Sequence, residues 1–173
     1  MREPPPEANE VLRRLYLEYG QDLLAVAATI LGQTHGAWDV LHDVFIGLAR
    51  NLGHLLPDTN YRAYLVRAAV NRATDHLRKV RVRNEEPPDA METAPAPQAQ
   101  PIELVSDSEE ALRLWRAVCE LPPEQRRVVS QHIYGQLTFS QIAQADGVSE
   151  NTCQSRYRYA LEKLRKSLLE VPQ

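Results

Sequence analysis

The sequence predicts an all-α protein of two small helical domains joined by a flexible acidic linker, the second domain containing a helix-turn-helix. Three observations predict this fold class. Apolar residues recur at helical spacing along most of the chain, whereas β-branched runs are few and the 173 residues include only seven glycines. One internal stretch of prolines, alanines and acids lacks that spacing. It separates a domain over residues 8–83 from a second over residues 108–170.

Three helices are expected in the first domain. The first covers residues 11–31 and ends at Gly32, because glycine adopts the left-handed conformation that commonly ends a helix. The second covers residues 36–51, and the third begins after Asn60, a capping residue type, and continues to about Arg81. The first two helices each carry an apolar stripe, formed by Leu12, Leu15, Tyr16, Tyr19, Leu23, Val26, Ala27 and Ile30 in one and by Ala37, Val40, Leu41, Val44, Phe45 and Leu48 in the other.

Residues 84–107 are predicted to form the linker, because they cannot bury enough apolar surface to offset the entropy of ordering. They also dominate the charge pattern. Residues 84–110 hold eight acids and no Lys or Arg, a net −8, whereas residues 1–83 carry +2 and residues 111–173 carry +3, which sum to −3. The net charge of the whole chain is therefore close to zero although the chain contains two mildly basic segments, and this pattern is compatible with nucleic-acid binding. A small apolar island of Ile102, Leu104 and Val105 either docks on a partner or domain, or is a harmless cluster.

The second domain begins with an amphipathic helix over residues 108–120, and Pro122 and Pro123 open the next helix. A helix over residues 139–145, with Ile142 and Ala143 inward, is followed by a tight turn at residues 146–148. Ser149 is the expected N-cap of the last helix. Together these signals indicate a helix-turn-helix.

The last helix has two distinct faces. Cys153, Tyr157, Ala160, Leu161, Leu164 and Leu168 are expected inward, opposite Gln154, Ser155, Arg158, Tyr159 and Glu162. A polar face of this kind fits a DNA major groove, where its N-terminal end contacts base edges. The alternative is a plain helical hairpin with a solvated polar face.

Two faces of the first domain also carry candidate functional residues. The third helix presents Tyr64, Arg67, Asn71, Asp75 and Arg78 on one side, followed by a basic tail. Aromatic, amide and guanidinium groups suit unpaired bases and phosphates, although a solvated helix with routine ion pairs has the same composition. The second helix presents Trp38, Asp39, His42 and Asp43 outside its apolar stripe. An exposed tryptophan beside paired acids indicates a protein interface, unless Trp38 packs on the first helix.

Catalysis and cofactor binding are not expected. The five histidines lack metal-ligand spacing, and the sequence contains neither HExxH, a glycine-rich phosphate loop nor a nucleophile elbow. Cys119 and Cys153 lie in apolar helical patterns and are expected to be reduced core residues. No window is apolar enough for a transmembrane helix and the N-terminus lacks a signal core, so neither membrane insertion nor export is expected and the cytoplasm is the expected location.

Three segments together resemble the extracytoplasmic-function (ECF) group of bacterial RNA polymerase sigma factors. LYLEYGQDLLAVAATILG with AWDVLHDVFIGLAR resembles the leading helices and polymerase-binding segment of the family, with Trp38 in place of the usual acid and His42 in place of the usual Gln. YRAYLVRAAVNRATDHLRK resembles the promoter-melting helix. LPPEQRRVV and TCQSRYRYALEKLR resemble the helix-turn-helix that reads the −35 element, where Gln154 and Tyr159 replace commonly basic residues.

The resemblance implies a role for each face. The first domain would bind the β′ clamp helices of core RNA polymerase through Trp38, Asp39, His42 and Asp43 and would hold the −10 single strand. The residues implied for the −10 strand are Leu56, Asn60, Tyr64, Arg67, Asn71 and Arg78. The second domain would dock on the β flap and read the −35 element of promoter DNA through Gln154, Ser155, Arg156, Arg158 and Tyr159. The family also implies an anti-sigma factor as a partner.

Two other functions remain open at this stage. A stand-alone DNA-binding regulator explains the second domain but gives the polar faces of the first domain no purpose. A sigma-like adaptor that binds protein but not DNA explains the first domain and leaves the recognition helix unused.

Overall fold

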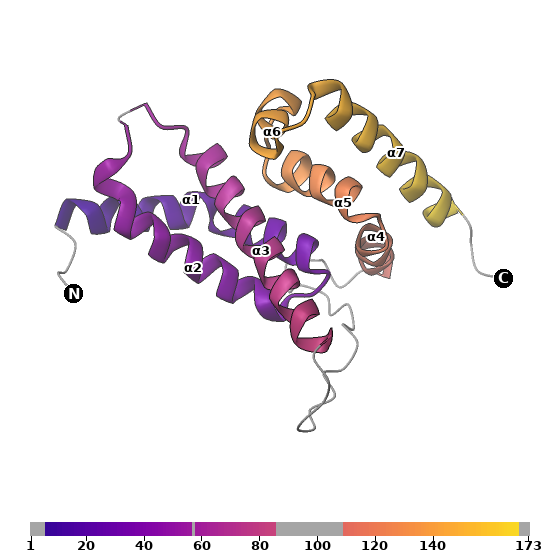
Figure 1. The fold of residues 1–173 in the computed structure, drawn as a ribbon, viewed down its shortest axis with the longest axis horizontal. Helices are drawn as coiled ribbons and strands as arrows, with labels where there is room; N and C mark the ends of the chain where they lie inside the picture. The colour runs from indigo at the N-terminus through magenta and orange to yellow at the C-terminus, as the bar shows by residue number, and fades with distance from the viewer. Residues whose placement is uncertain (1–5, 57, 86–108, 170–173) are drawn as a thin grey trace.

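The computed structural model describes residues 6–56, 58–85 and 109–169, and every regular element within these ranges is a helix. The expected all-α fold is therefore confirmed. The first domain consists of α1 (Pro6–Leu31), α2 (His35–Asn51), the short 3₁₀ helix η1 (Leu52–His54) and α3 (Tyr61–Glu85). The second consists of α4 (Glu109–Cys119), α5 (Pro123–Val129), the π-helical turn η2 (Ser130–Tyr134), α6 (Phe139–Asp146) and α7 (Glu150–Leu169). Figure 1 shows the two groups of helices next to each other.

The expected linker lies, apart from its first two residues, outside the described residues, as does the apolar island at Ile102, Leu104 and Val105. α3 continues through those first two residues to Glu85, four residues beyond its expected end near Arg81.

Local signals place the end of α1 and the start of α3 as expected, whereas α1 begins at Pro6, five residues before its expected start. Gly32 adopts a left-handed backbone conformation with φ of 69°, and its N–H donates to the Ala28 carbonyl at 2.9 Å. At the start of α3, the Asn60 side-chain oxygen accepts a hydrogen bond from the Ala63 N–H at 3.0 Å. These caps fix where α1 ends and where α3 begins.

The second half of α1 is buried on all sides. Residues 26–31 form an unbroken run in which no residue is more than 6% exposed. α1 packs on α2 and α3 with one side and contacts α4, α5 and η2 of the second domain with the other. The apolar stripe expected for α1 therefore includes too few of these residues. This part of the helix is apolar on every side, and other helices cover every side. In the first half of α1 the expected stripe includes a residue that is not buried, because Tyr16 is 45% exposed.

One hydrophobic core runs through both domains. It includes most of the buried residues of α1, α2 and α3 together with Trp115, Val128, Leu137, Ile142 and Cys153 of the second domain. A smaller cluster behind α7 consists of Ala117, Val118, Leu121, Val129, Ala160 and Leu164. Leu161, which was expected inward, is instead 45% exposed. It follows Ala160 directly, and a helical turn of about 100° per residue carries it out of the apolar stripe.

Both cysteines are free thiols, Cys153 buried and Cys119 half-buried. Burial raises the pKa of each thiol, which keeps both sulfurs protonated and weakly nucleophilic at neutral pH. Among the helices that the structure describes, none is both long and apolar enough to cross a membrane.

Candidate functional site

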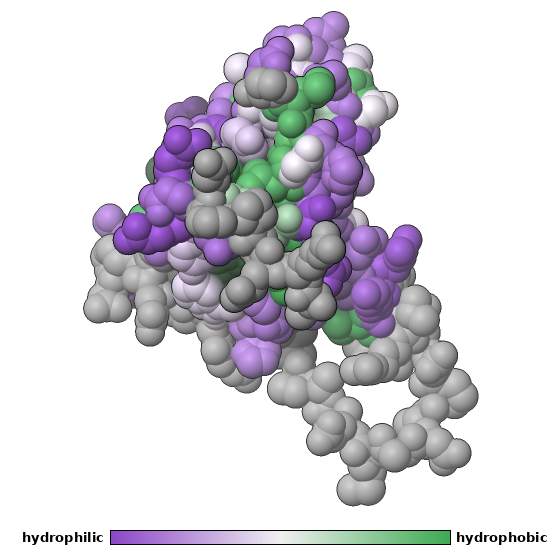
Figure 2. All heavy atoms as spheres, turned by 90° about the vertical axis from the view of Figure 1, so that its left-hand side faces the viewer, coloured by the Kyte–Doolittle hydropathy of each residue, from purple (hydrophilic) through white to green (hydrophobic). Residues whose placement is uncertain are grey.

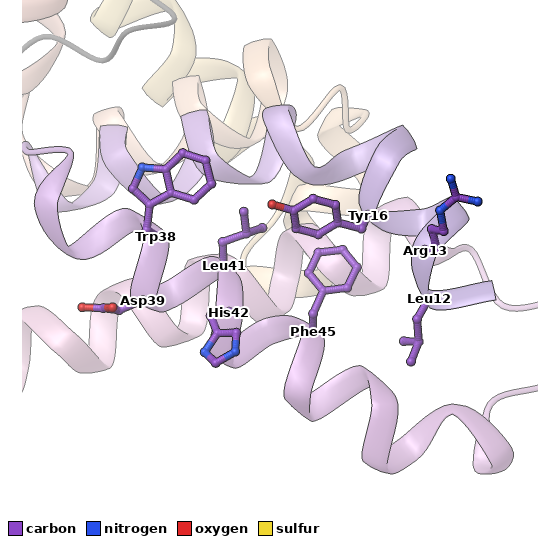
Figure 3. Close-up of a pocket in the computed structure, with 8 residues that line it drawn as sticks. All are labelled: Leu12, Arg13, Tyr16, Trp38, Asp39, Leu41, His42 and Phe45. Atoms are coloured by element: carbon purple, nitrogen blue, oxygen red, sulfur yellow. The ribbon is translucent and has the colours of Figure 1, made fainter. Parts of the chain in front are cut away.

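An open groove lies between α1 and α2. We call it the α1–α2 groove; its volume is about 570 Å³ and its lining consists of Leu12, Arg13, Tyr16, Trp38, Asp39, Leu41, His42 and Phe45. Tyr16 and Phe45 meet edge to face, with ring centroids 5.2 Å apart. Figure 3 shows the Trp38 indole on the same side as these rings, whereas Asp39 points away from them. The indole is 53% exposed, so α1 does not cover it.

The four residues expected to bind a protein partner do not all face this groove. Trp38, Asp39 and His42 line it, and all three are exposed. Asp43 is exposed as well but pairs with Arg72 of α3, with 3.5 Å between carboxylate and guanidinium. Because both side chains of this pair are about half exposed, water screens it and it holds Asp43 only weakly. Asp39 therefore lines an apolar, aromatic groove, whereas Asp43, one turn further along α2, lies outside its lining.

The groove continues into a second hollow that sequence reasoning missed. Tyr16, Trp38 and Leu41 are shared by both hollows, and the second is completed by Leu17, Gly20, Gln21 and Leu24. Leu17 is 70% exposed. Figure 2 shows a strip of hydrophobic residues between hydrophilic ones on the face of the molecule it presents. The signal in the sequence was the adjacent pair Tyr16–Leu17, which no single apolar stripe on α1 can bury.

The candidate nucleic-acid face of α3 is largely open to solvent. Arg67, Asn71 and Arg78 are exposed, and Arg78 pairs with Asp75 at 3.2 Å. Tyr64 is only partly exposed, because its ring also packs against the core. Together with Asp75, these residues follow one another at spacings of three or four positions, so they form one stripe along the helix.

The loop before α3 completes this face. Leu56 is 71% exposed although it is apolar. Asn60 is exposed; its side-chain oxygen accepts a hydrogen bond from the Ala63 N–H, and its NH₂ group can donate to a ligand. The loop that leads into α3 thus adds an exposed apolar side chain and an exposed amide just before the helix that carries Tyr64 and Arg67.

The helix-turn-helix is built from strong local signals. Thr138 and Gln141 form a reciprocal capping box at the start of α6. Gly147 ends α6 in the left-handed conformation with φ of 67°. Ser149 accepts a hydrogen bond from the Thr152 N–H at 3.1 Å, which confirms it as the N-cap of α7.

Packing then fixes the direction of α7. The Phe139 and Tyr157 rings pack around His132, whose centroid lies 4.4 Å and 4.9 Å from theirs. At the end of α6, the Asp146 side chain is 6% exposed and receives three hydrogen bonds of 2.8 to 3.0 Å from Arg127. The start of α7 is therefore held in place by this aromatic cluster and by the ion pair between Arg127 and Asp146.

The outward face of α7 carries most of the residues that were expected to contact DNA. Gln154, Arg158 and Tyr159 are exposed, and Ser155 is partly exposed. The Gln154 amide donates to Glu150 at 3.3 Å, and the Arg158 guanidinium lies over the Tyr159 ring at 5.2 Å. Both contacts are exposed and local, so the two side chains can exchange them for other partners.

Arg156 differs from the other expected readers. It is partly buried and pairs with Glu124 of α5 at 3.0 Å. Sequence reasoning also missed Asn151, which is exposed at the first turn of α7, three residues before Gln154 and on the same face. The signal was the Ser149 cap, which places Asn151 in the exposed first turn of α7. No group of three or more potential metal ligands gathers anywhere in the described ranges.

Comparison with known proteins identifies both halves of this arrangement. Residues 15–83 match the family model described as Sigma-70 region 2, and residues 111–164 match Sigma-70, region 4. The ECF RNA polymerase sigma factor SigE of Mycolicibacterium smegmatis is 27% identical over 164 residues, covering 94% of this chain and 62% of that protein. SigL of Mycobacterium tuberculosis, also an ECF sigma factor, is 28% identical over 163 residues, covering 93% and 90%.

A third relative matches over a shorter stretch. The ECF sigma factor RpoE of Cereibacter sphaeroides is 32% identical over 100 residues, which are 58% of this chain and 54% of that protein. The chain therefore spans less than two thirds of SigE and of this RpoE, but most of SigL.

Two solved structures have a similar fold. The sigma factor RpoE of Bartonella quintana, solved in complex with the anti-sigma factor NepR, superposes with a TM-score of 0.69 at 19% identity, covering 93% of this chain and 98% of that one. CnrH, solved in complex with the cytosolic domain of CnrY, gives a TM-score of 0.64 at 22% identity, covering 92% and 88%.

Proposed function

The chain belongs to the sigma-70 family, in its ECF group of RNA polymerase sigma factors, and from this premise we propose that it binds core RNA polymerase and directs promoter-specific initiation. The proposal rests on one observation: the same chain has an exposed aromatic groove and two separate candidate DNA-binding faces. The factor acts in the cytoplasm, where polymerase and promoter are found, and it supplies binding energy without catalysing a reaction itself.

The α1–α2 groove is the proposed polymerase site. Trp38, Asp39 and His42 bind the β′ clamp helices, and Asp43 contributes charge at the rim. A half-exposed indole beside carboxylates gives such an interface an apolar anchor and a charged edge. The second domain docks on the β flap in this proposal.

Promoter DNA meets the other two faces. Leu56, Asn60, Tyr64, Arg67, Asn71 and Arg78 hold the −10 strand after it leaves the duplex. Melting then follows from differential binding, because the face favours unstacked bases over paired ones. Gln154, Ser155, Arg158 and Tyr159 read the −35 element, and Arg156 contacts a phosphate once Glu124 releases it. RpoE of Bartonella quintana was solved with an anti-sigma factor, and we extend that kind of partner to this chain.

Reversal of charge at the groove tests polymerase binding. We expect the double variant Asp39→Arg, Asp43→Arg to bind core polymerase at least about ten-fold more weakly, a loss of about 1.4 kcal/mol, because rim carboxylates steer and orient a basic partner. The matched control is Glu120→Arg, Glu162→Arg, which makes the same change in net charge at exposed positions of the second domain. Competition for core polymerase against a labelled wild-type chain measures the effect.

Run-off transcription separates this function from its alternatives. Purified chain added to core polymerase is expected to give transcripts from a subset of genomic fragments. Duplex binding without transcripts would favour a stand-alone DNA-binding regulator. Polymerase binding without salt-sensitive binding to a fork-junction probe would favour an adaptor.

A further inference from the structure

An ion pair joins α2, which carries the candidate polymerase residues, to α3, which carries most of the candidate −10 residues. We call it the Asp43–Arg72 pair. Arg72 Nη1 of α3 lies 3.5 Å from Asp43 Oδ2 of α2. Arg72 Nη2 lies next to Gly47, where an added Cβ atom would be only 3.2 Å away. The guanidinium therefore extends along one turn of α2, from Asp43 to Gly47.

The glycine in this contact lies within a helix, where glycine is unfavourable. α2 runs from His35 to Asn51, so Gly47 is not a cap of this helix. Glycine inside a helix is less stable than alanine, because it loses more backbone entropy on folding. At position 47, however, the missing Cβ leaves the space that the guanidinium occupies. The sequence thus has a helix-destabilising residue at the place where Arg72 lies against α2.

The Asp43–Arg72 pair is weak enough to be exchanged for other partners. Its two side chains are 58% and 45% exposed, so water screens the attraction between them. Its distance of 3.5 Å is also longer than the roughly 2.7–2.9 Å of a strong charge-assisted hydrogen bond. A cation or an anion that approaches from solution can therefore compete with either member of the pair.

Each member of the pair lies beside a different candidate binding face. Asp43 is one turn along α2 from Asp39, which lines the α1–α2 groove. Arg72 directly follows Asn71 on α3, and both side chains are exposed. A basic partner on α2 attracts the Asp43 carboxylate, and the guanidinium that loses this carboxylate is free to bind a phosphate.

We propose that Arg72 binds a phosphate of the −10 strand, and that Asp43 holds it back until polymerase engages this carboxylate. The inference rests on the proposed function. In the free chain the pair weakens both binding steps, because each ligand must first break it. In the complex with polymerase the strand meets a guanidinium that is already free. The coupling is reciprocal, so the bound strand also favours polymerase binding.

Replacement of Arg72 should strengthen polymerase binding, although it removes a potential contact. Arg72→Ala is expected to bind core polymerase about two- to five-fold more tightly, because the partner no longer competes with an exposed ion pair. Arg50→Ala removes another exposed cation, at the end of α2, and measures the effect of net charge alone. In an Asp43→Asn background, the gain from Arg72→Ala should fall to that of Arg50→Ala. Competition against a labelled wild-type chain measures these affinities.

The same replacement should weaken DNA binding once polymerase is bound. With saturating core polymerase, the slope of log affinity against log salt for a fork-junction probe is expected to fall by about 0.7 in Arg72→Ala, the value for one phosphate of a single strand. Arg50→Ala should leave this slope unchanged. A residue with a purely structural role would not change the two steps in opposite directions.

Three results would overturn the proposal. The first is a gain in polymerase affinity from Arg72→Ala that is the same with and without the Asp43 carboxylate. The second is weaker polymerase binding by an Arg72→Ala chain that circular dichroism shows to be folded. The third is an unchanged salt slope. A wild-type chain that does not bind core polymerase would instead refute the proposed function, and the exchange with it.

Discussion

At the scale of single residues, Gln154 is the best-placed candidate for base recognition. It lies one turn into α7, is exposed, and is held only by a 3.3 Å contact to Glu150. A glutamine amide can pair with adenine through both its donor and its acceptor. In the proposed function, an uncharged Gln154 where the family commonly has a basic residue would shift binding energy from phosphate attraction to the recognition of DNA bases.

Replacement of Gln154 by alanine is expected to relax specificity at one base pair. The loss of discrimination should be about 1–3 kcal/mol at that position, with little change in binding to unrelated DNA. Glu162→Ala, at an exposed position further along α7, is the control. Binding of the holoenzyme to a set of upstream elements, each with one substitution, measures this. A uniform loss of affinity across the whole set would indicate a phosphate contact instead.

At the scale of elements, the turn of the helix-turn-helix depends on one left-handed residue. Gly147 has φ of +67°, and nothing lies within 4 Å of a Cβ placed there. Gly53 also has open space around it but no positive φ, which makes it a matched control. Gly147→Ala should therefore lower the free energy of unfolding by about 1 kcal/mol through backbone strain alone. Urea denaturation should show almost no loss for Gly53→Ala, and equal effects of both changes would refute this explanation.

Most of the helices could be predicted from the sequence because their signals are local. Asn60, Thr138, Gly147 and Ser149 act on their own turn of backbone, and apolar spacing identifies an inward face without knowledge of what covers it. The π-helical geometry of η2 could not be predicted, since nothing in SQHIY distinguishes it from an α-helical turn.

Residues of the candidate site could be predicted where their side chains point away from the apolar stripe of their own helix. Gln154 and Arg158 are exposed for that reason. Arg156 is different, because its ion pair with Glu124 joins helices that are distant in sequence. The groove neighbours Tyr16 and Leu17 were missed for the same reason, since their exposure depends on how α1 and α2 pack.

At the scale of the whole molecule, the two family regions share one core. The contact between the two domains, where α1 packs against α4, α5 and η2, joins residues far apart in the sequence, and apolar periodicity cannot reveal it. Its one sequence signal is the stretch AVAATIL at the end of α1, which is apolar on every face and therefore requires cover on every face. α2 and α3 cover part of it, and the second domain covers the rest. The stability of each domain should consequently depend on the other.

Cooperative unfolding is the expected consequence, and the two tryptophans make it measurable. Trp115 is 3% exposed and belongs to the shared core, whereas Trp38 is exposed, so Trp38→Phe leaves a single fluorescent reporter in the second domain at little cost in stability. Urea unfolding followed by this fluorescence should coincide with unfolding followed by helical circular dichroism, because loss of one domain uncovers the core of the other. Val66 of α3 lies close to Gly135 of the second domain. Val66→Ala removes side-chain volume at this contact between the domains and should separate the two curves, with the fluorescence transition moving to lower urea. Curves already separate in the Trp38→Phe chain would mean that the domains unfold independently and that the contact between them contributes little to stability.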